Sequence, residues 1–244
     1  LVGSEMCIRD RFLVGASKVT TGSSLLSDLH PKSSLYIDLK NVEHWFGGIL
    51  PMEIIIEKDD AIDLPMHNTV VMGHIKEFQV QLNRMFPESN WISIQRVLEE
   101  VLHEIDPDEK FPPDQETLDQ INMITQDQTQ NLINFDENKI RISGMLPDLS
   151  SDELDEDRAS IMSYTKKNFP DWLSVVITGT MPVALNTNDY LILDLFSGFG
   201  LAFIFISIIM GLLFLSFRVG LISMLPNLIP IVFAAGYLGF MGIP

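Results

Sequence analysis

The last fifty residues of the chain carry an almost unbroken apolar pattern. Residues 195–217 hold no charged side chain, Arg218 follows alone, and residues 219–244 are again uncharged. A helix needs about 20 apolar residues to cross the hydrocarbon of a bilayer. A buried helix of a soluble protein is the alternative, but such helices usually have one polar face. The pattern predicts a transmembrane helix, which we place at 190–217 so that it includes a short polar lead-in before the uncharged run.

A second apolar stretch follows after a short connection. Proline lacks a backbone N–H and disfavours a helical residue before it, so a helix is expected to begin near Pro226. This predicts a cytoplasmic connection at 218–225, a second transmembrane helix at 226–244, and a helical hairpin. Small residues let helices approach closely inside a membrane, although glycine is also common there for other reasons. The residues assigned to helix packing are Pro226, Asn227, Pro230, Gly236 and Gly239.

Residues 13–189 show shorter, periodic stretches. Apolar residues recur at spacings of four and three between Asn68 and Phe86, which predicts an amphipathic helix. Other patterns predict, in chain order, a helix at 35–46 ended by Gly47-Gly48, strands at 51–57 and 91–94, mainly helical residues at 95–135, a strand at 139–145, a helix from the Ser150/Glu153 capping box to Asn168, and a strand at 173–178 closed by Gly179. This order implies an α+β sandwich of the ferredoxin-like type, followed by the all-α transmembrane hairpin.

Charge limits the partners of the domain. The net charge of −17 resides almost entirely upstream of residue 190. Such acidity argues against binding to nucleic acid or to an anionic membrane surface. Arg218, in the connection between the two apolar stretches, places that connection in the cytoplasm by the positive-inside rule. The domain at 13–189 is therefore expected outside. Cys7 is the single cysteine, so no internal disulfide can form.

The two ends of the sequence suggest a piece of a longer protein. The chain begins without Met and ends within an apolar stretch. Residues 1–11 resemble a translated sequencing adapter, and an ordinary polar tail is the alternative. We therefore assign residues 1–12 as a non-native or disordered tail.

The polar side chains show no catalytic or metal-binding pattern. The five histidines lack metal-ligand spacing, and there is no Gly-rich phosphate loop, nucleophile elbow or Cys–His pair. The acidic run at 148–157 lacks the spacing of an EF-hand loop, so a solvated helix start is the preferred interpretation. No enzyme activity, metal or cofactor is expected.

Several motifs, in this order, resemble one membrane-protein family. They are Phe46-Gly47-Gly48, Arg141-Ile142-Ser143, Thr178-Gly179-Thr180, Arg218-Val-Gly-Leu-Ile222, Pro226-Asn-Leu-Ile-Pro-Ile231 and Gly239-Phe-Met-Gly-Ile-Pro244. Together they resemble the resistance–nodulation–division (RND) superfamily, in its MMPL-like branch related to the sterol-sensing domain. The resemblance implies a porter domain and two helices of one six-helix half, which we place in the C-terminal half.

The resemblance implies a secondary active transporter rather than an enzyme. The expected function is proton-driven export of hydrophobic or lipid-like substrates from the cytoplasmic (inner) membrane, with the domain on the periplasmic side. Its coupling carboxylates are expected in a helix beyond Pro244, and Asp194, Ser197 and Gly198 are candidates to line the substrate path. Expected partners are membrane lipids and the substrate, with a homo-oligomer or envelope proteins left open. The alternatives are a sterol-sensing-type lipid-binding protein without pumping, an accessory export subunit and a stand-alone anchored domain.

Overall fold

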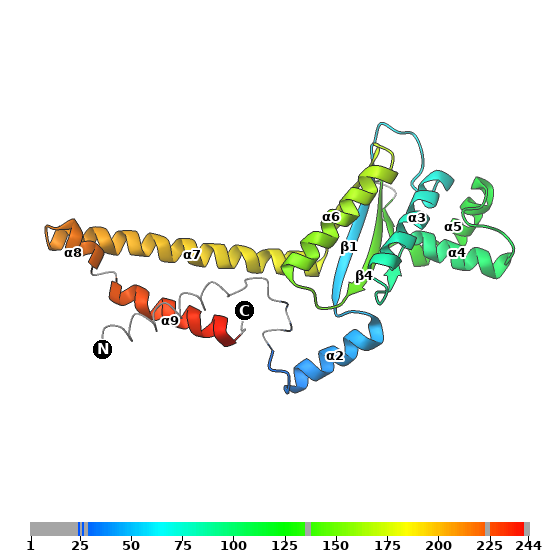
Figure 1. The fold of residues 1–244 in the computed structure, drawn as a ribbon. Helices are drawn as coiled ribbons and strands as arrows, with labels where there is room; N and C mark the ends of the chain where they lie inside the picture. The colour runs from blue at the N-terminus through cyan, green and yellow to red at the C-terminus, as the bar shows by residue number, and fades with distance from the viewer. Residues whose placement is uncertain (1–23, 25, 27–28, 135–137, 223–224, 242–244) are drawn as a thin grey trace. The chain divides into compact units, whose positions relative to one another are not determined.

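The computed structural model describes residues 24, 26, 29–134, 138–222 and 225–241. The chain divides into two compact units. One unit, the α+β domain, comprises Leu29–Leu185, and the other, the apolar unit, comprises Asn186–Pro244 with Leu1–Asp28. The predicted tail at 1–12 lies outside the described residues. Figure 1 shows the elements of both units.

The α+β domain is built on an antiparallel sheet. Its strands are β1 (Leu50–Lys58), β2 (Trp91–Ile92), β3 (Ile133–Asn134), β4 (Lys139–Leu146) and β5 (Leu173–Thr178). Hydrogen bonding gives the order β2-β4-β1-β5, and β3 pairs with β4. All pairs are antiparallel, and β1 has a neighbour on each side. The predicted mixture of helices and strands is confirmed, and the sheet is antiparallel.

One face of the sheet forms the hydrophobic core. Side chains alternate between faces along a strand, and β1 accordingly buries Met52, Ile54 and Ile56 completely. Ile54 lies opposite Ile142 on β4 and Ile177 on β5, so the middle of this face is apolar on all three strands.

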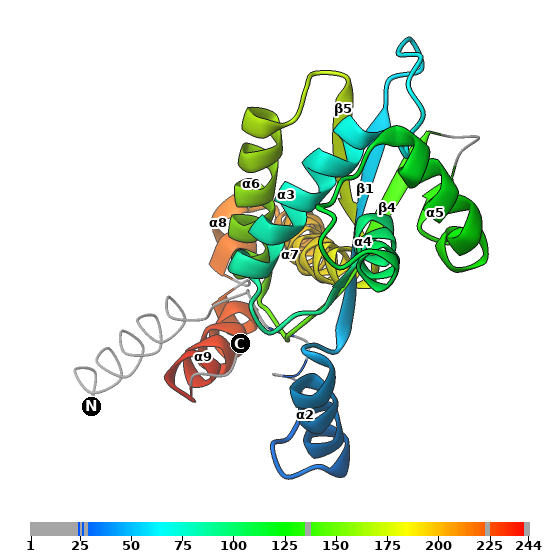
Figure 2. The same cartoon turned by 90° about the vertical axis from the view of Figure 1, so that its right-hand side faces the viewer.

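Two helices, α3 (Thr69–Met85) and α6 (Ser151–Asn168), cover this face, as Figures 1 and 2 show. Phe78 of α3 joins them, because its ring lies 5.9 Å from Tyr164 and 5.5 Å from Phe169, measured between centroids.

The remaining helices of the domain are α2 (Ser34–Phe46), α4 (Ile94–Ile105) and α5 (Gln115–Thr129). All five helices begin with a side chain that accepts a bond from a free backbone N–H, as expected for N-caps. The capping residues are Ser33, Asn68, Ser93, Asp114 and Ser150. The predicted capping box is confirmed, since Ser150 and Glu153 each bond the other's backbone N–H.

The predicted elements agree closely with the observed ones in this domain. The strand at 173–178 and the helix ending at Asn168 match within a residue. The strand predicted at 91–94 ends at Ile92, because Ser93 instead caps the following helix and Ile94 is its first residue.

Three helices follow the last strand: α7 (Thr180–Leu213), α8 (Phe217–Ile222) and α9 (Leu225–Met241). The helix α7 begins in the α+β domain, where Met181 and Leu185 are buried. It starts ten residues before the predicted boundary at 190. Pro182 is tolerated in the first turn, because backbone N–H groups there have no acceptor within the helix. The helix ends before Leu215, which adopts φ 49°. The predicted connection at 218–225 contains most of α8.

Within the described residues, α7 is the helix long and apolar enough to cross a membrane, and none of its apolar stretch is buried. The helix α9 has 17 residues, with its most apolar part at Leu228–Tyr237. The second transmembrane helix, and with it the hairpin, therefore stays a prediction.

Glycines occupy the positions where the chain enters and leaves the sheet. Gly47 has φ 75° and Gly179 has φ 112°, values that side-chain-bearing residues rarely adopt. A Cβ on Gly48 would overlap the backbone of Leu146, and one on Gly179 would lie 2.8 Å from the carbonyl oxygen of Pro51. Entry and exit therefore meet at the same end of the sheet.

We predict opposite effects for alanine at two glycines of the domain. Gly144→Ala should lower the free energy of unfolding by about 1–3 kcal/mol, because its Cβ would overlap the fully buried Trp91 ring. Gly73→Ala should raise it by about 0.5–1 kcal/mol, because Gly73 lies inside α3 and its Cβ would meet only Pro112, at 3.9 Å. Urea unfolding of the chain in detergent micelles measures both. Equal effects of one sign would contradict the packing described here.

The capping box predicts a pH-dependent effect. Hydrogen bonds from the backbone N–H and the hydroxyl of Ser150 lower the pKa of Glu153 from its ordinary value of 4.5. This stabilisation is therefore present above pH 4.5 and is lost as the pH falls through the folded-state pKa. Glu153→Gln should lower the melting temperature at pH 7, and the difference should close as the pH falls through the lowered folded-state pKa of Glu153. Asp152→Asn removes a charge from the same turn outside the capping box, so its smaller effect is the control.

Candidate functional site

The predicted substrate-path residues lie on one face of α7. Asp194, Ser197 and Gly198 are three and four residues apart, a spacing that places side chains on the same side of a helix. All three are exposed. A Cβ built on Gly198 meets no atom within 4 Å among the described residues. The structure therefore groups these residues but brings no second described element against Gly198.

The predicted helix-packing residues all lie on α9. Gly236 is buried and Gly239 partly so, whereas Pro226 and Pro230 are exposed. Asn227 belongs to the same helix.

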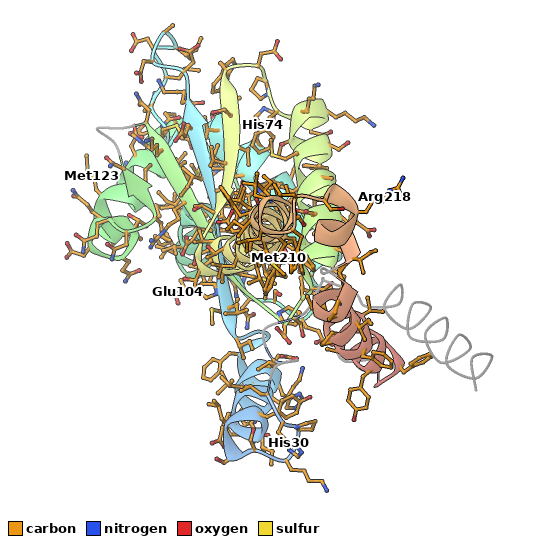
Figure 3. The ribbon with its side chains drawn as sticks, turned by 90° about the vertical axis from the view of Figure 1, so that its left-hand side faces the viewer. His30, His74, Glu104, Met123, Met210 and Arg218 are labelled. Carbon is orange, nitrogen blue, oxygen red and sulfur yellow. The ribbon has the colours of Figure 1, made fainter. Side chains whose placement is uncertain are left out.

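The sequence interpretation missed a closer helix contact. A Cβ on Gly220 of α8 would lie 3.0 Å from the Ser207 carbonyl oxygen and 3.1 Å from the Gly211 nitrogen, both on α7. The signal available was a glycine on each side of the turn between the two helices, at positions 211 and 220. Arg218 is exposed, and Figure 3 shows its side chain projecting from α8.

The α+β domain has a polar cavity between α3 and α4. Its volume is about 550 Å³, and its lining includes Lys76, Gln79, Gln95, Arg96, Glu99 and His103. A cavity with these polar groups is the natural place to look for chemistry in the domain.

The inner wall of this cavity is a closed hydrogen-bond network. The Trp91 carbonyl oxygen accepts bonds from Gln79 Nε2 at 3.2 Å and from Arg96 Nη1 at 3.1 Å. The Ser93 hydroxyl donates to Gln79 Oε1 and accepts from the backbone N–H of Arg96. Gln79 and Ser93 are both buried, and burial is costly for a polar group without partners. This network therefore holds α3, β2 and α4 together.

The outer wall of the cavity holds an ion pair. Lys76 Nζ lies 2.7 Å from Glu99 Oε1 and donates to the Phe111 carbonyl oxygen at 3.2 Å. It also lies 5.8 Å from the centroid of the Phe111 ring, within cation–π range. These contacts tie α3 to α4 and to the loop before α5, which indicates a structural role.

The sheet face opposite α3 and α6 carries paired charges. The Ser143 hydroxyl donates to Glu53 Oε1 at 3.0 Å, and Arg141 Nε lies 3.5 Å from Glu53 Oε2. Lys139 Nζ lies 3.4 Å from Glu57 Oε1. Two of the motif residues quoted above, at 141 and 143, thus act together on Glu53. Half-exposed pairs of this kind contribute little stability, but they keep the open face polar.

Two carboxyl groups near the acidic start of α6 have pKa values shifted in opposite directions. Burial raises the pKa of Asp157, and the neighbouring charges of Glu153 and Glu156 raise it further. Capping, by contrast, lowers the pKa of Glu153.

Among the described residues no group of three or more His, Cys, Asp or Glu side chains is arranged to hold a metal ion. Two of the five histidines have other neighbours: His67 Nε2 lies 3.2 Å from Asp119 Oδ1, and the His74 ring lies 5.8 Å from the ring of Phe169.

The hydrogen bonds and ion pairs of the cavity between α3 and α4, and the charge pairs on the open sheet face, are thus contacts within the fold. No protein-family model, no curated protein and no solved structure matches the chain.

We predict that the contact between α7 and α8 depends on Gly220. Gly220→Leu should displace α8 from α7, because the backbone of α7 lies within about 3 Å of the new side chain's first atom. Trypsin should then cleave after Arg218 several-fold faster in detergent micelles. Gly198→Leu is the matched control, since the Cβ at 198 meets no atom within 4 Å. Equal cleavage rates for both variants would show that this helix contact is not formed.

Proposed function

We propose that this chain is part of a proton-driven membrane exporter of the RND/MMPL type, which moves hydrophobic or lipid-like substrates out of the cytoplasmic membrane. One observation carries the proposal. An antiparallel α+β domain passes directly into a 34-residue helix whose apolar stretch is unburied. Exposed apolar surface of this length has no stable place in water, whereas a bilayer matches it.

The strand order supports a ferredoxin-like porter domain. Taking β1, β2, β4 and β5 as the four strands in chain order, the sheet runs fourth, first, third, second, with every pair antiparallel. The helices α3 and α6 then connect the first strand to the second and the third to the fourth, as in a split β-α-β unit. On this basis α4, α5 and β3 form an insertion between the second and third strands.

The arrangement of charge supports the proposed orientation. Arg218 follows the apolar stretch of α7, and the strongly acidic domain precedes it. The positive-inside rule then places Arg218 in the cytoplasm and the domain on the periplasmic side. We further propose that α9 belongs to a second span, which makes the protein multi-pass.

Proton coupling requires an ionisable group within the membrane. Asp194 lies at the start of the apolar stretch, and 195–217 carries no acid. The proposal therefore places the coupling carboxylate in a further helix of the exporter. A sterol-sensing-type protein that binds lipid without pumping is the alternative, and it needs no such carboxylate.

Flux measurements on the complete gene product test the proposal. In liposomes containing a pH dye, we expect an imposed proton gradient to drive substrate movement, and a lipid-like substrate to accelerate proton movement. This chain alone should show no flux above that of empty liposomes, because two helices cannot enclose a pathway. Lipid binding without proton movement by the complete protein would favour the sterol-sensing alternative and overturn the exporter.

A further inference from the structure

The helix α2 presents an apolar surface that the described residues leave uncovered. None of its 13 residues is buried. Leu35, Trp45 and Phe46 have 54%, 71% and 58% of their surface exposed. A helix of a soluble domain normally buries its apolar stripe, so this surface requires an explanation.

Four apolar residues of α2 form a stripe, in which Leu35 and Phe46 are exposed and Leu39 and Val42 are half-buried. The exposed Trp45 flanks this stripe, and the exposed Ile37 lies outside it. Leu35, Leu39, Val42 and Phe46 follow one another at spacings of four, three and four, which places them on one side of the helix. Away from this stripe, Lys40 Nζ pairs with Glu43 Oε1 at 2.8 Å. The helix is thus amphipathic, with aromatic residues at its C-terminal end.

The attachment of α2 to the sheet is tight. Gly47 and Gly48 leave no room for side chains against the backbones of Glu88 and Leu146. The Ile49 backbone N–H donates to the Leu146 carbonyl oxygen at 2.9 Å. The helix therefore joins the domain at the end of the sheet where Gly179 leads into α7.

Chain connectivity sets the distance between this end and the apolar stretch. Leu185 is the last residue of the α+β domain, and the charge-free stretch begins at Leu195. Ten residues span at most about 35 Å when extended and about 15 Å as a helix. If α7 crosses a membrane, the chain therefore keeps Leu185 within about 35 Å of the start of the apolar stretch.

The charge on α2 suits a neutral lipid surface. Residues 29–48 carry Lys32 and Lys40 against Asp38 and Glu43, so they are neutral in a chain of net charge −17. The acidic start of α6 follows Leu146 at the same end of the sheet, and it would repel anionic lipids. Trp is favoured where hydrocarbon meets water, and Trp, Phe and Leu are typical of the apolar face of interfacial helices.

We propose that α2 lies in the lipid–water interface of the membrane, with its apolar stripe against the acyl chains of zwitterionic phospholipids. A helix of this kind binds in the plane of the interface without crossing it. The helix then holds the domain close to the membrane surface from which the proposed exporter takes its substrate. This inference rests on the proposed function, because it requires α7 to be in a membrane.

Fluorescence of Trp45 in bilayers tests the inference. The full chain is reconstituted in phosphatidylcholine vesicles. In one experiment the acyl chains are brominated and quench tryptophan within the hydrocarbon. In the other, iodide is added and quenches tryptophan exposed to water. Wild type is compared with Trp45→Phe. More than half of the bromine-quenched emission should be lost in Trp45→Phe. The other two tryptophans, Trp91, which is fully buried, and Trp172, which is half-buried just before β5, are the same in both proteins and contribute an unchanged background.

A double variant, Trp45→Phe with Met123→Trp, provides the matched control. Met123 of α5 is 76% exposed. The helix α5 lies far from α2 along the sheet: its first residue, Gln115, accepts a hydrogen bond from Asn68, which caps α3 and follows the far end of β1. The introduced tryptophan should be quenched by iodide and not by brominated lipid. The same pattern at Trp45 would place α2 in water and overturn the inference.

Two further results would each have a different meaning. Protection of Trp45 from both quenchers would show that protein covers α2, such as a second copy of the chain, and would also overturn the inference. Flotation of the vesicles on a density gradient is measured in parallel. A chain that fails to float refutes the membrane location on which the proposed function depends, whereas a chain that floats with Trp45 in water refutes only the lipid contact of α2.

Discussion

The whole α+β domain depends on the pairing of β1 with a strand on each side. This pairing aligns Ile54 with Ile142 and Ile177, which creates the apolar face that α3 and α6 cover. A shift of one residue would turn Glu53 and Glu57 toward the helices and the isoleucines toward solvent. The cost of burying carboxylates without partners therefore makes one register far more stable than its neighbours.

Hydrophobic periodicity predicted most of the helices and strands, because each buries one face against the same core. It could not predict what covers α2, since the stripe from Leu35 to Phe46 shows that a face is apolar but not which surface it meets. The pattern also placed the start of the apolar helix α7 ten residues too late. Residues 180–189 include polar side chains, so a helix start drawn from hydropathy falls after them. The helix nevertheless includes them and begins at Thr180.

For the candidate site, the sequence predicted only which residues share one side of a helix. Spacing alone places Asp194, Ser197 and Gly198 on one side of α7, but no sequence pattern says which helix faces them. The contact between Gly211 and Gly220 depends on how the chain turns after α7, where Leu215 adopts an uncommon backbone conformation. Conversely, the polar cavity of the domain could be interpreted only with the structure, since its buried bonds join residues far apart in sequence.

The meeting of entry and exit at one end of the sheet makes the domain a removable module. The chain enters through Gly48 and leaves through Gly179, which approaches Pro51 closely. Because both crossing points lie together, a short turn could replace everything between them with little change in the separation of the flanking segments. Related domains could be exchanged at the same junction during evolution or by design. The pair of glycines therefore marks a natural boundary for chimaeras.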